Sequence, residues 1–227
     1  MKAGVFYKEG DIRFDDFADP VCGDDDVIIK VKAAGICGSD PPRILNLWKY
    51  PRPQVPGHEF AGTIAEVGKN VKNFKLDDAV VAQPLIPCRK CENCEEGHFS
   101  MCNDMQMLGA DLPGGFAQYV RVPATNIQHI ECENLEEAAL IEPCAVALYG
   151  VLGIRPEIGD TVAILGCGTI GQLVLQWFRL AGVHRIIAVD ISKKKLEEAK
   201  ASAQISASTV WNRIRWKLSW RQRMARA

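Results

Sequence analysis

The sequence predicts an α/β plus β protein, in which a β-rich, barrel-like domain is followed by the start of a parallel α/β sheet. Two observations carry this prediction. Residues 1–130 contain short runs of strand-like alternation that end in Gly, Pro or Asp, as is typical of β-barrels. Residues 160–200 instead alternate buried-type strands with helical periodicity, in the order β-α-β-α.

Four segments of the first region have the periodicity of strands. Val27, Ile29 and Val31 share one face of the segment DVIIKVKAAG, and the residues between them share the other. The segments AGTIAEVG, DDAVVAQPL and GGFAQYVRVP are further short strands with turn-forming residues at their ends. Together they favour an antiparallel barrel.

The second region begins with helical signals. Asn134 is placed to cap a short helix through LEEAALI, and Pro143 to open another, since its missing N–H costs nothing in a first turn. The strand DTVAILG and the amphipathic helix IGQLVLQWFRLAG follow. The strand RIIAVD then leads to the helix KKKLEEAK, with Ser192 as its N-cap.

Composition limits the class of protein. The chain has 227 residues, of which 48% are hydrophobic and 24% charged, as in ordinary globular proteins. Its net charge of −1 includes six basic residues near the C-terminus, and without them 21 basic residues stand against 28 acidic ones. This balance argues against nucleic acid as the main partner.

The sequence also predicts the cellular compartment of the protein. The N-terminus lacks the apolar core of a signal peptide, and no apolar run is long enough to span a membrane. We therefore expect a cytoplasmic protein with no membrane partner. Its nine cysteines would stay reduced, which makes them candidate metal ligands or reactive thiols.

Four cysteines occur within fifteen residues. Cys88, Cys91, Cys94 and Cys102 follow the pattern C-x2-C-x2-C-x7-C. Such spacing lets the thiolates turn toward one ion and form the closed tetrahedral site of a structural zinc. An iron–sulfur cluster is the alternative, since ferredoxins use similar spacings.

A second group of metal-binding residue types is spread over three segments. GICGSD supplies Cys37, GHEFAG supplies His58 followed by Glu59, and LIEPCAV supplies Glu142 and Cys144. Three protein ligands with one open position make a catalytic zinc site. Spacing alone does not establish that these segments meet.

The motif GCGTIG predicts a dinucleotide site. Gly166, Gly168 and Gly171 follow a strand directly and open a helix, so they suit a tight turn, a close approach of the pyrophosphate and close helix packing. Phosphate charge would face the helix N-terminus. Asp190 ends the next strand, where its carboxylate can bind the ribose 2′-hydroxyl, which favours NAD over NADP.

These motifs, in the order GICGSD, PGHEFAG, four cysteines, GGFAQYV, IEP and GCGTIG, resemble those of zinc-dependent medium-chain dehydrogenases. The segments CGSDPPRI, PLIPCRKC and LIEP are most similar to galactitol-1-phosphate dehydrogenases, with sorbitol and threonine dehydrogenases nearby. The resemblance implies a GroES-like catalytic domain at residues 1–150 and the first half of a Rossmann NAD-binding domain at 151–201. Residues 202–227 do not align with the family pattern.

The resemblance also implies ligands. Cys37, His58 and Glu142 match the catalytic zinc ligands, and the four-cysteine segment matches the structural zinc site. Glu59 matches a residue near the metal that can exchange onto it. Cys144, two positions from Glu142, matches a small packed thiol rather than a ligand.

The resemblance further implies a reaction. Ser39 matches the hydroxyl that accepts the alcohol proton, and Asp40 matches the carboxylate that orients the histidine ligand. Zinc would polarise a secondary alcohol, on a polyol or sugar alcohol phosphate, and NAD would take the hydride. Arg43 could meet a phosphorylated substrate end or be an ordinary solvated surface residue.

The C-terminal segment leaves the activity open. Family members continue with a second dinucleotide half and the usual dimer edge, which we expect this chain to lack. It would then be an active dehydrogenase, an inactive zinc-binding fragment, or a nucleic-acid or membrane binder through its basic tail. We interpret the tail as out-of-frame translation that begins near residue 201, or as an error in the source sequence. This interpretation predicts an exposed sheet edge after the second strand of the parallel sheet and a tendency to aggregate. The tail is rich in Arg, Lys and Trp: Trp211, Arg213, Arg215, Trp216, Lys217, Trp220, Arg221, Arg223 and Arg226.

Overall fold

The computed structural model describes residues 1–47, 49–202 and 206–209. The chain forms two compact units, Met1–Glu142 and Pro143–Ala227. The predicted domain boundary at residue 150 lies inside helix α4 (Ile141–Ile154), whose first two residues belong to the first unit. None of the helices in the described part of the chain is both long and apolar enough to span a bilayer.

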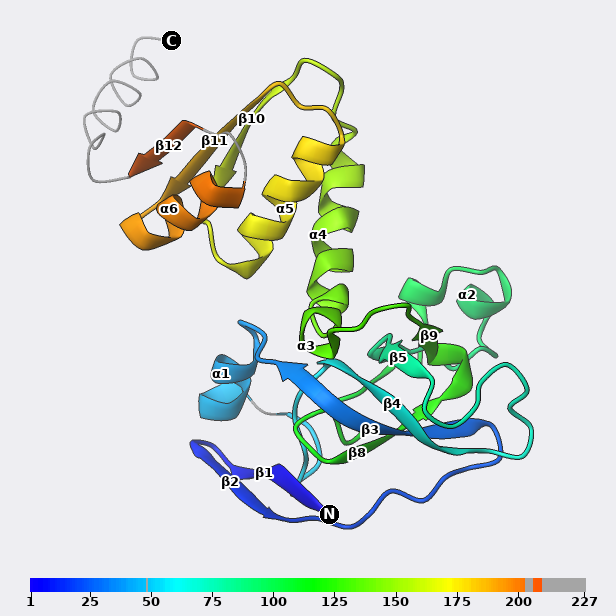
Figure 1. Cartoon of the computed structure of the whole chain (residues 1–227). Coiled ribbons are helices and arrows are strands. Elements are labelled where there is room, and N and C mark those ends of the chain that lie inside the picture. The colour runs from blue at the N-terminus through cyan, green and yellow to red at the C-terminus, as the bar shows by residue number, and fades with distance from the viewer. Residues whose placement is uncertain (48, 203–205, 210–227) are drawn as a thin grey trace. The chain divides into compact units, whose positions relative to one another are not determined.

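The first unit is built on a curled antiparallel sheet with the strand order β8-β3-β4-β5-β9 (Figure 1). Each of the four segments predicted as strands overlaps one of these strands. The sheet comprises β3 (Asp26–Gly35), β4 (Glu59–Val67), β5 (Ala79–Ala82), β8 (Tyr119–Pro123) and β9 (Ile127–His129). Its inward face supplies a core that includes Val27, Ile29, Phe60, Ile64 and Val120. This confirms the barrel-like antiparallel domain.

Smaller elements complete the first unit. Two antiparallel pairs flank the main sheet: β1 (Lys2–Lys8) with β2 (Asp11–Asp16), and β6 (Leu85–Ile86) with β7 (Gln106–Met107). The short helices are α1 (Asp40–Pro42), a π-helical turn (Arg43–Leu47), α2 (Glu92–Glu95), 3-10 turns (Phe99–Met101 and Ala124–Asn126) and α3 (Leu135–Ala138). Asn134 caps α3 as predicted, because its Oδ1 accepts the N–H of Glu136 at 3.0 Å.

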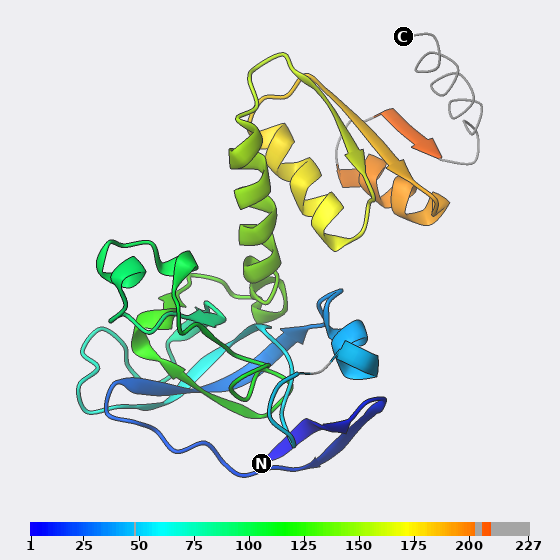
Figure 2. The ribbon, with the colours of Figure 1, turned by 180° about the vertical axis from the view of Figure 1, so that it is seen from behind.

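The second unit contains a parallel sheet with the strand order β10-β11-β12, and the two views place both of its crossover helices on one face (Figures 1 and 2). Leu175 and Phe178 pack there against the sheet residues Ile186 and Ala188. Ser192 caps the second helix, with its Oγ accepting the N–H of Lys195 at 3.4 Å. After α4 the elements are β10 (Thr161–Leu165), α5 (Thr169–Leu180), β11 (Arg185–Asp190), α6 (Lys193–Ser202) and β12 (Ser206–Thr209).

Two predictions for this unit need correction. Pro143 was predicted to open a helix, but helix α4 begins two residues earlier. Proline is tolerated there because the N–H groups of a helix's first turn have no partner within the helix. The predicted free edge after the second strand is also wrong, because β12 pairs with β11. Helix α6 returns the chain to the edge of β11. Strand β12 then pairs with the backbone N–H and C=O groups that this edge leaves free. The unit is thus a complete β-α-β-α-β half. Within the described residues, the two outer strands, β10 and β12, form the edges of this sheet.

Candidate metal and dinucleotide sites

Three metal-binding side chains converge where β3 and β4 meet. Cys37 follows the end of β3, His58 precedes β4, and Glu59 is the first residue of β4. Their candidate ligand atoms all lie within 4.8 Å of one another. The pairing of the two strands, which sets Gly35 opposite Glu59, brings these distant segments together.

The turn before β4 directs the side chain of His58 toward Cys37 and Glu59. Gly57 has a φ of +97°, a left-handed conformation that favours glycine. A Cβ at this position would also come within 2.6 Å of Phe116 Cδ1. The chain can therefore enter β4 in this direction only with glycine at position 57.

His58 is buried and faces Asp40. Its Nδ1 has no hydrogen-bond partner among the described residues and lies 3.5 Å from Asp40 Oδ1. Burial lowers the pKa of His58, and the nearby Arg43 charge lowers it further, against the opposite effect of Asp40 and Glu59. These effects favour a neutral imidazole, which is the form that binds metals.

Glu142 and Glu59 are two neighbouring carboxyl groups. Burial, followed by repulsion from Glu59, raises the pKa of Glu142 to about 7. Glu142 does not belong to the tight group of ligand atoms, in which Glu59 is the carboxylate. Cys144, the alternative ligand, lies on the part of α4 in the second unit, where its carbonyl accepts the indole N–H of Trp177 at 3.1 Å. Glu142 as the third ligand therefore stays a prediction.

Ser39 and Arg43 lie one helical turn apart, beside Asp40. The N–H of Arg43 donates to the Ser39 carbonyl at 3.3 Å. Ser39 stands at the N-cap position of α1, but its side chain makes no capping hydrogen bond. Arg43 is partly buried, and its Nη1 donates to the thioether of Met107 at 3.9 Å. These contacts do not fit a fully solvated arginine.

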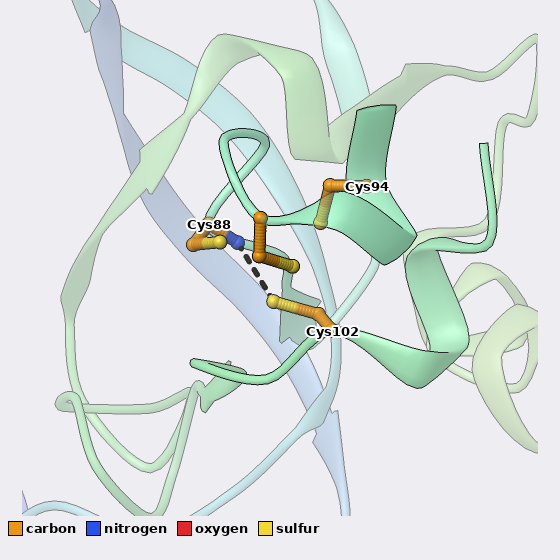
Figure 3. Close-up of side chains that lie close together, drawn as sticks. Cys88, Cys94 and Cys102 are labelled. Atoms are coloured by element: carbon orange, nitrogen blue, oxygen red, sulfur yellow. Dashed lines mark hydrogen bonds between the residues drawn. The ribbon is translucent and has the colours of Figure 1, made fainter. Parts of the chain in front are cut away.

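The four cysteines of the second group also converge. Their sulfur atoms lie within 4.8 Å of one another, and Figure 3 shows Cys88, Cys94 and Cys102 turned toward a common point. Cys102 Sγ accepts backbone N–H groups from Cys88 at 3.1 Å and Asp104 at 3.4 Å. Such donors stabilise thiolates, the form that binds metals.

The pKa values within this group diverge. Hydrogen bonds from the backbone of Asn103 and Cys94 lower the pKa of Cys91 to about 6. Burial raises the pKa of Cys94 to about 12. A cation would remove this difference, because it favours the thiolate at every position. The donor set therefore fits a tetrahedral metal such as zinc.

The glycine loop of the second unit has the geometry of a phosphate cradle. Gly166 has a φ of +98°, as the predicted tight turn requires. A Cβ on Gly171 would overlap the carbonyl oxygen of Gly166, whereas one on Gly168 would meet nothing within 4 Å. The loop thus combines close helix packing with open space at the N-terminus of α5.

Asp190 links this loop to the next turn, a role that sequence reasoning missed. Its Oδ2 accepts the N–H of Cys167 and its Oδ1 accepts the N–H of Ser192, each at 2.7 Å. These bonds lower the pKa of Asp190 and keep its carboxylate charged. The sequence signal for Asp190 was its place at the end of the strand that comes after the glycine motif. That signal predicted the contact with the ribose but not the hydrogen bonds to the backbone.

Comparison with known proteins places these features in context. Residues 23–132 match the model of the alcohol dehydrogenase GroES-like domain. The sorbitol dehydrogenase of Bacillus subtilis is 36% identical over 206 residues, which cover 88% of this chain and 58% of that protein.

Two solved structures are similar in the same way. The galactitol-1-phosphate dehydrogenase of Escherichia coli is 35% identical with a TM-score of 0.85, and the match covers 91% of this chain and 61% of that one. A zinc-binding dehydrogenase of Sinorhizobium meliloti, bound to NADP, is 34% identical with a TM-score of 0.87 over 92% and 61% of the two chains. The chain spans about three fifths of the length of these relatives.

Proposed function

The chain belongs to the zinc-dependent medium-chain dehydrogenases, and on that basis we propose that it oxidises a secondary alcohol with NAD as hydride acceptor. The observation that carries the proposal is the convergence of Cys37, His58 and Glu59 next to the buried carboxylate of Asp40. A soft thiolate, an imidazole and carboxylates form the mixed donor set of a catalytic zinc.

We assign two zinc ions to the chain. Cys88, Cys91, Cys94 and Cys102 would hold the structural ion, which leaves it no open position. Cys37, His58 and Glu142 would hold the other, with Glu59 able to take a place at the metal. Zinc bound there would supply Lewis acidity toward a hydroxyl oxygen.

The chain's own residues would prepare this site for an alcohol. Asp40 faces Nδ1 of His58 at 3.5 Å and fixes the backbone at Cys37 through a hydrogen bond of 2.9 Å. Ser39 Oγ, which is not used for capping, would accept the proton of the alcohol. The guanidinium of Arg43, on the same helical face as Ser39, suits an anionic substrate end. A sugar alcohol phosphate is therefore the preferred substrate class, and an unphosphorylated polyol the second.

The nicotinamide cofactor would bind at the glycine loop of the second unit. Backbone N–H groups at the N-terminus of α5 suit its pyrophosphate. The charged Asp190 would bind the ribose 2′-hydroxyl and repel a 2′-phosphate, which favours NAD. The cofactor supplies the hydride-accepting nicotinamide ring.

A second candidate function is that of a zinc-binding chain without turnover, for which the convergence of the four cysteines alone suffices. The third candidate, a binder of nucleic acid or membranes through the basic tail, concerns residues 210–227, which lie outside the described residues.

Metal analysis combined with NAD titration of the purified chain separates these candidates. Two zinc ions, binding of NAD and oxidation of sugar alcohols support the dehydrogenase. Two zinc ions without NAD binding support the second candidate. Iron in place of zinc, or at most one zinc in folded protein, contradicts the two-site assignment. Activity on primary alcohols alone contradicts the proposed substrate class.

A further inference from the structure

Gly35 lies directly against the functional carboxylate of Glu59. It is the last residue of β3 and pairs with Glu59, the first residue of β4. A Cβ built on Gly35 would overlap Oε2 of Glu59 and would lie 3.2 Å from its Cβ and 3.5 Å from its Cδ. The carboxylate of Glu59 thus occupies the space that a side chain at position 35 would fill.

Backbone conformation does not explain glycine at this position. The φ of Gly35 lies outside the left-handed region, in contrast to that of Gly57. Glycine weakens a strand because it gains nothing from packing and loses more entropy on folding. At position 62 in the neighbouring strand, glycine is required by the backbone itself, since a Cβ there would overlap the backbone carbonyl of Lys30. At Gly35, all three of the nearest atoms belong to one side chain.

We propose that Gly35 is a positioning residue: its missing side chain leaves the space that holds the Glu59 carboxylate beside Cys37 and His58. An alanine at position 35 would force this carboxylate into another rotamer, away from the other two ligand atoms. The overlapping atom is the end of a flexible side chain, and the Glu59 Cβ at 3.2 Å requires the paired strands to shift by only a few tenths of an ångström. The inference rests on the proposed metal site and names a residue that determines its geometry.

The test is a Co²⁺ titration of the full chain, after one equivalent of Zn²⁺ has filled the four-cysteine site, with the thiolate–cobalt absorption as readout. Gly35→Ala should weaken Co²⁺ binding by about tenfold, the lower end of the effect known for residues that orient metal ligands. Gly38→Ala is the matched control, because a Cβ at this nearby position meets nothing within 4 Å. It should bind Co²⁺ like the parent chain.

A second pair of variants separates positioning from a structural role. If Gly35 acts through Glu59, then Gly35→Ala should have no further effect on Co²⁺ affinity in a Glu59→Ala background. The melting temperature of the metal-free protein should change little in either background.

Three results would overturn the inference. The first is parent-like Co²⁺ affinity in Gly35→Ala, and the second is an equal loss of affinity or of melting temperature with and without Glu59. The third is a parent chain that binds no Co²⁺ beyond the filled cysteine site. That result removes the proposed catalytic metal site as well, whereas the first two leave the proposed function intact.

Discussion

Asp40 Oδ1 lies 3.5 Å from Nδ1 of His58, and both side chains are buried. The other carboxylate oxygen of Asp40 accepts the backbone N–H of Cys37 at 2.9 Å. One acidic side chain therefore faces the imidazole of one predicted ligand and holds the backbone of another by a hydrogen bond. With Nδ1 facing a carboxylate, the other ring nitrogen, Nε2, is the one available to a metal.

We expect Asp40→Asn to weaken binding of the second Zn²⁺ by about 10- to 100-fold. The amide can still accept the N–H of Cys37, but it lacks the charge that favours an Nδ1–H tautomer on His58. Chelator competition measures this affinity. Asp19→Asn, at an exposed position, is the control. An unchanged affinity in Asp40→Asn would show that Asp40 does not support the site.

Cys91→Ser should remove the structural metal and lower the melting temperature. The hydroxyl that replaces this low-pKa thiol does not ionise near neutral pH and binds zinc poorly. Zinc content and thermal unfolding measure the two effects. Cys22→Ser is the matched control, because the Cys22 thiol bonds only the backbone carbonyls of Gly23 and Asp26 in the described structure. Equal melting of Cys91→Ser and the parent would contradict a zinc site in this segment.

Glu142 should make the metal-free protein less stable as the pH rises. Its folded pKa of about 7 lies above the unfolded value of 4.5, so the fold favours the protonated acid. The contribution is fully present below pH 4.5 and is lost as the pH rises through 7. Glu142→Gln should therefore match the parent at pH 4 and exceed its unfolding free energy at pH 8. We expect a gain of about 1 kcal/mol, since partial exposure screens the charge. Denaturant unfolding at both pH values tests this, and an equal gain at pH 4 would contradict it.

Asp190→Ala should weaken NAD binding and reduce the preference for NAD over NADP. The substitution removes the charge that repels a 2′-phosphate. It also leaves the N–H groups of Cys167 and Ser192 without their acceptor, so the melting temperature should fall as well. Titration with both cofactors measures the preference. Asp190→Asn, which retains an acceptor, should lose the preference with less effect on melting; if it keeps the full preference, the charge is not the cause.

Arg43→Gln should separate phosphorylated from unphosphorylated substrates. A hydrogen bond between charged groups contributes about 1.5–3 kcal/mol, so KM for a sugar alcohol phosphate should rise at least tenfold. KM for the corresponding polyol should hardly change. Steady-state kinetics on the matched pair of substrates tests this. An equal rise in KM for both substrates would show that Arg43 acts on His58 and not on the phosphate.

The sequence predicted those features that depend on local patterns. Strand β3 follows from its alternating side chains, and the caps Asn134 and Ser192 bond N–H groups two or three residues away. Strand β12 could not be predicted in this way. Residues 206–209 are small and mostly polar, and they form a strand because the edge of β11 offers them partners.

The residues of the candidate sites also differ in whether local patterns could predict them. The four cysteines could be grouped by spacing alone, because one short segment carries them all. Whether Glu59 or Glu142 completes the other group depends on the approach of separate elements, and the sequence contains no local signal for that distance. The role of Gly35 was equally hidden, since it appears only when β3 and β4 are paired.

The position of β11 between β10 and β12 sets the order in which backbone amides of the second unit should exchange with deuterium. In a parallel sheet, a central strand directs its N–H groups alternately to both neighbours, and both ladders run along Ile187–Val189 of β11. The amides of β10 that face away from β11 have no strand partner within the described residues. Deuterium should therefore enter β10 at every second amide, while β11 stays protected until the unit opens as a whole.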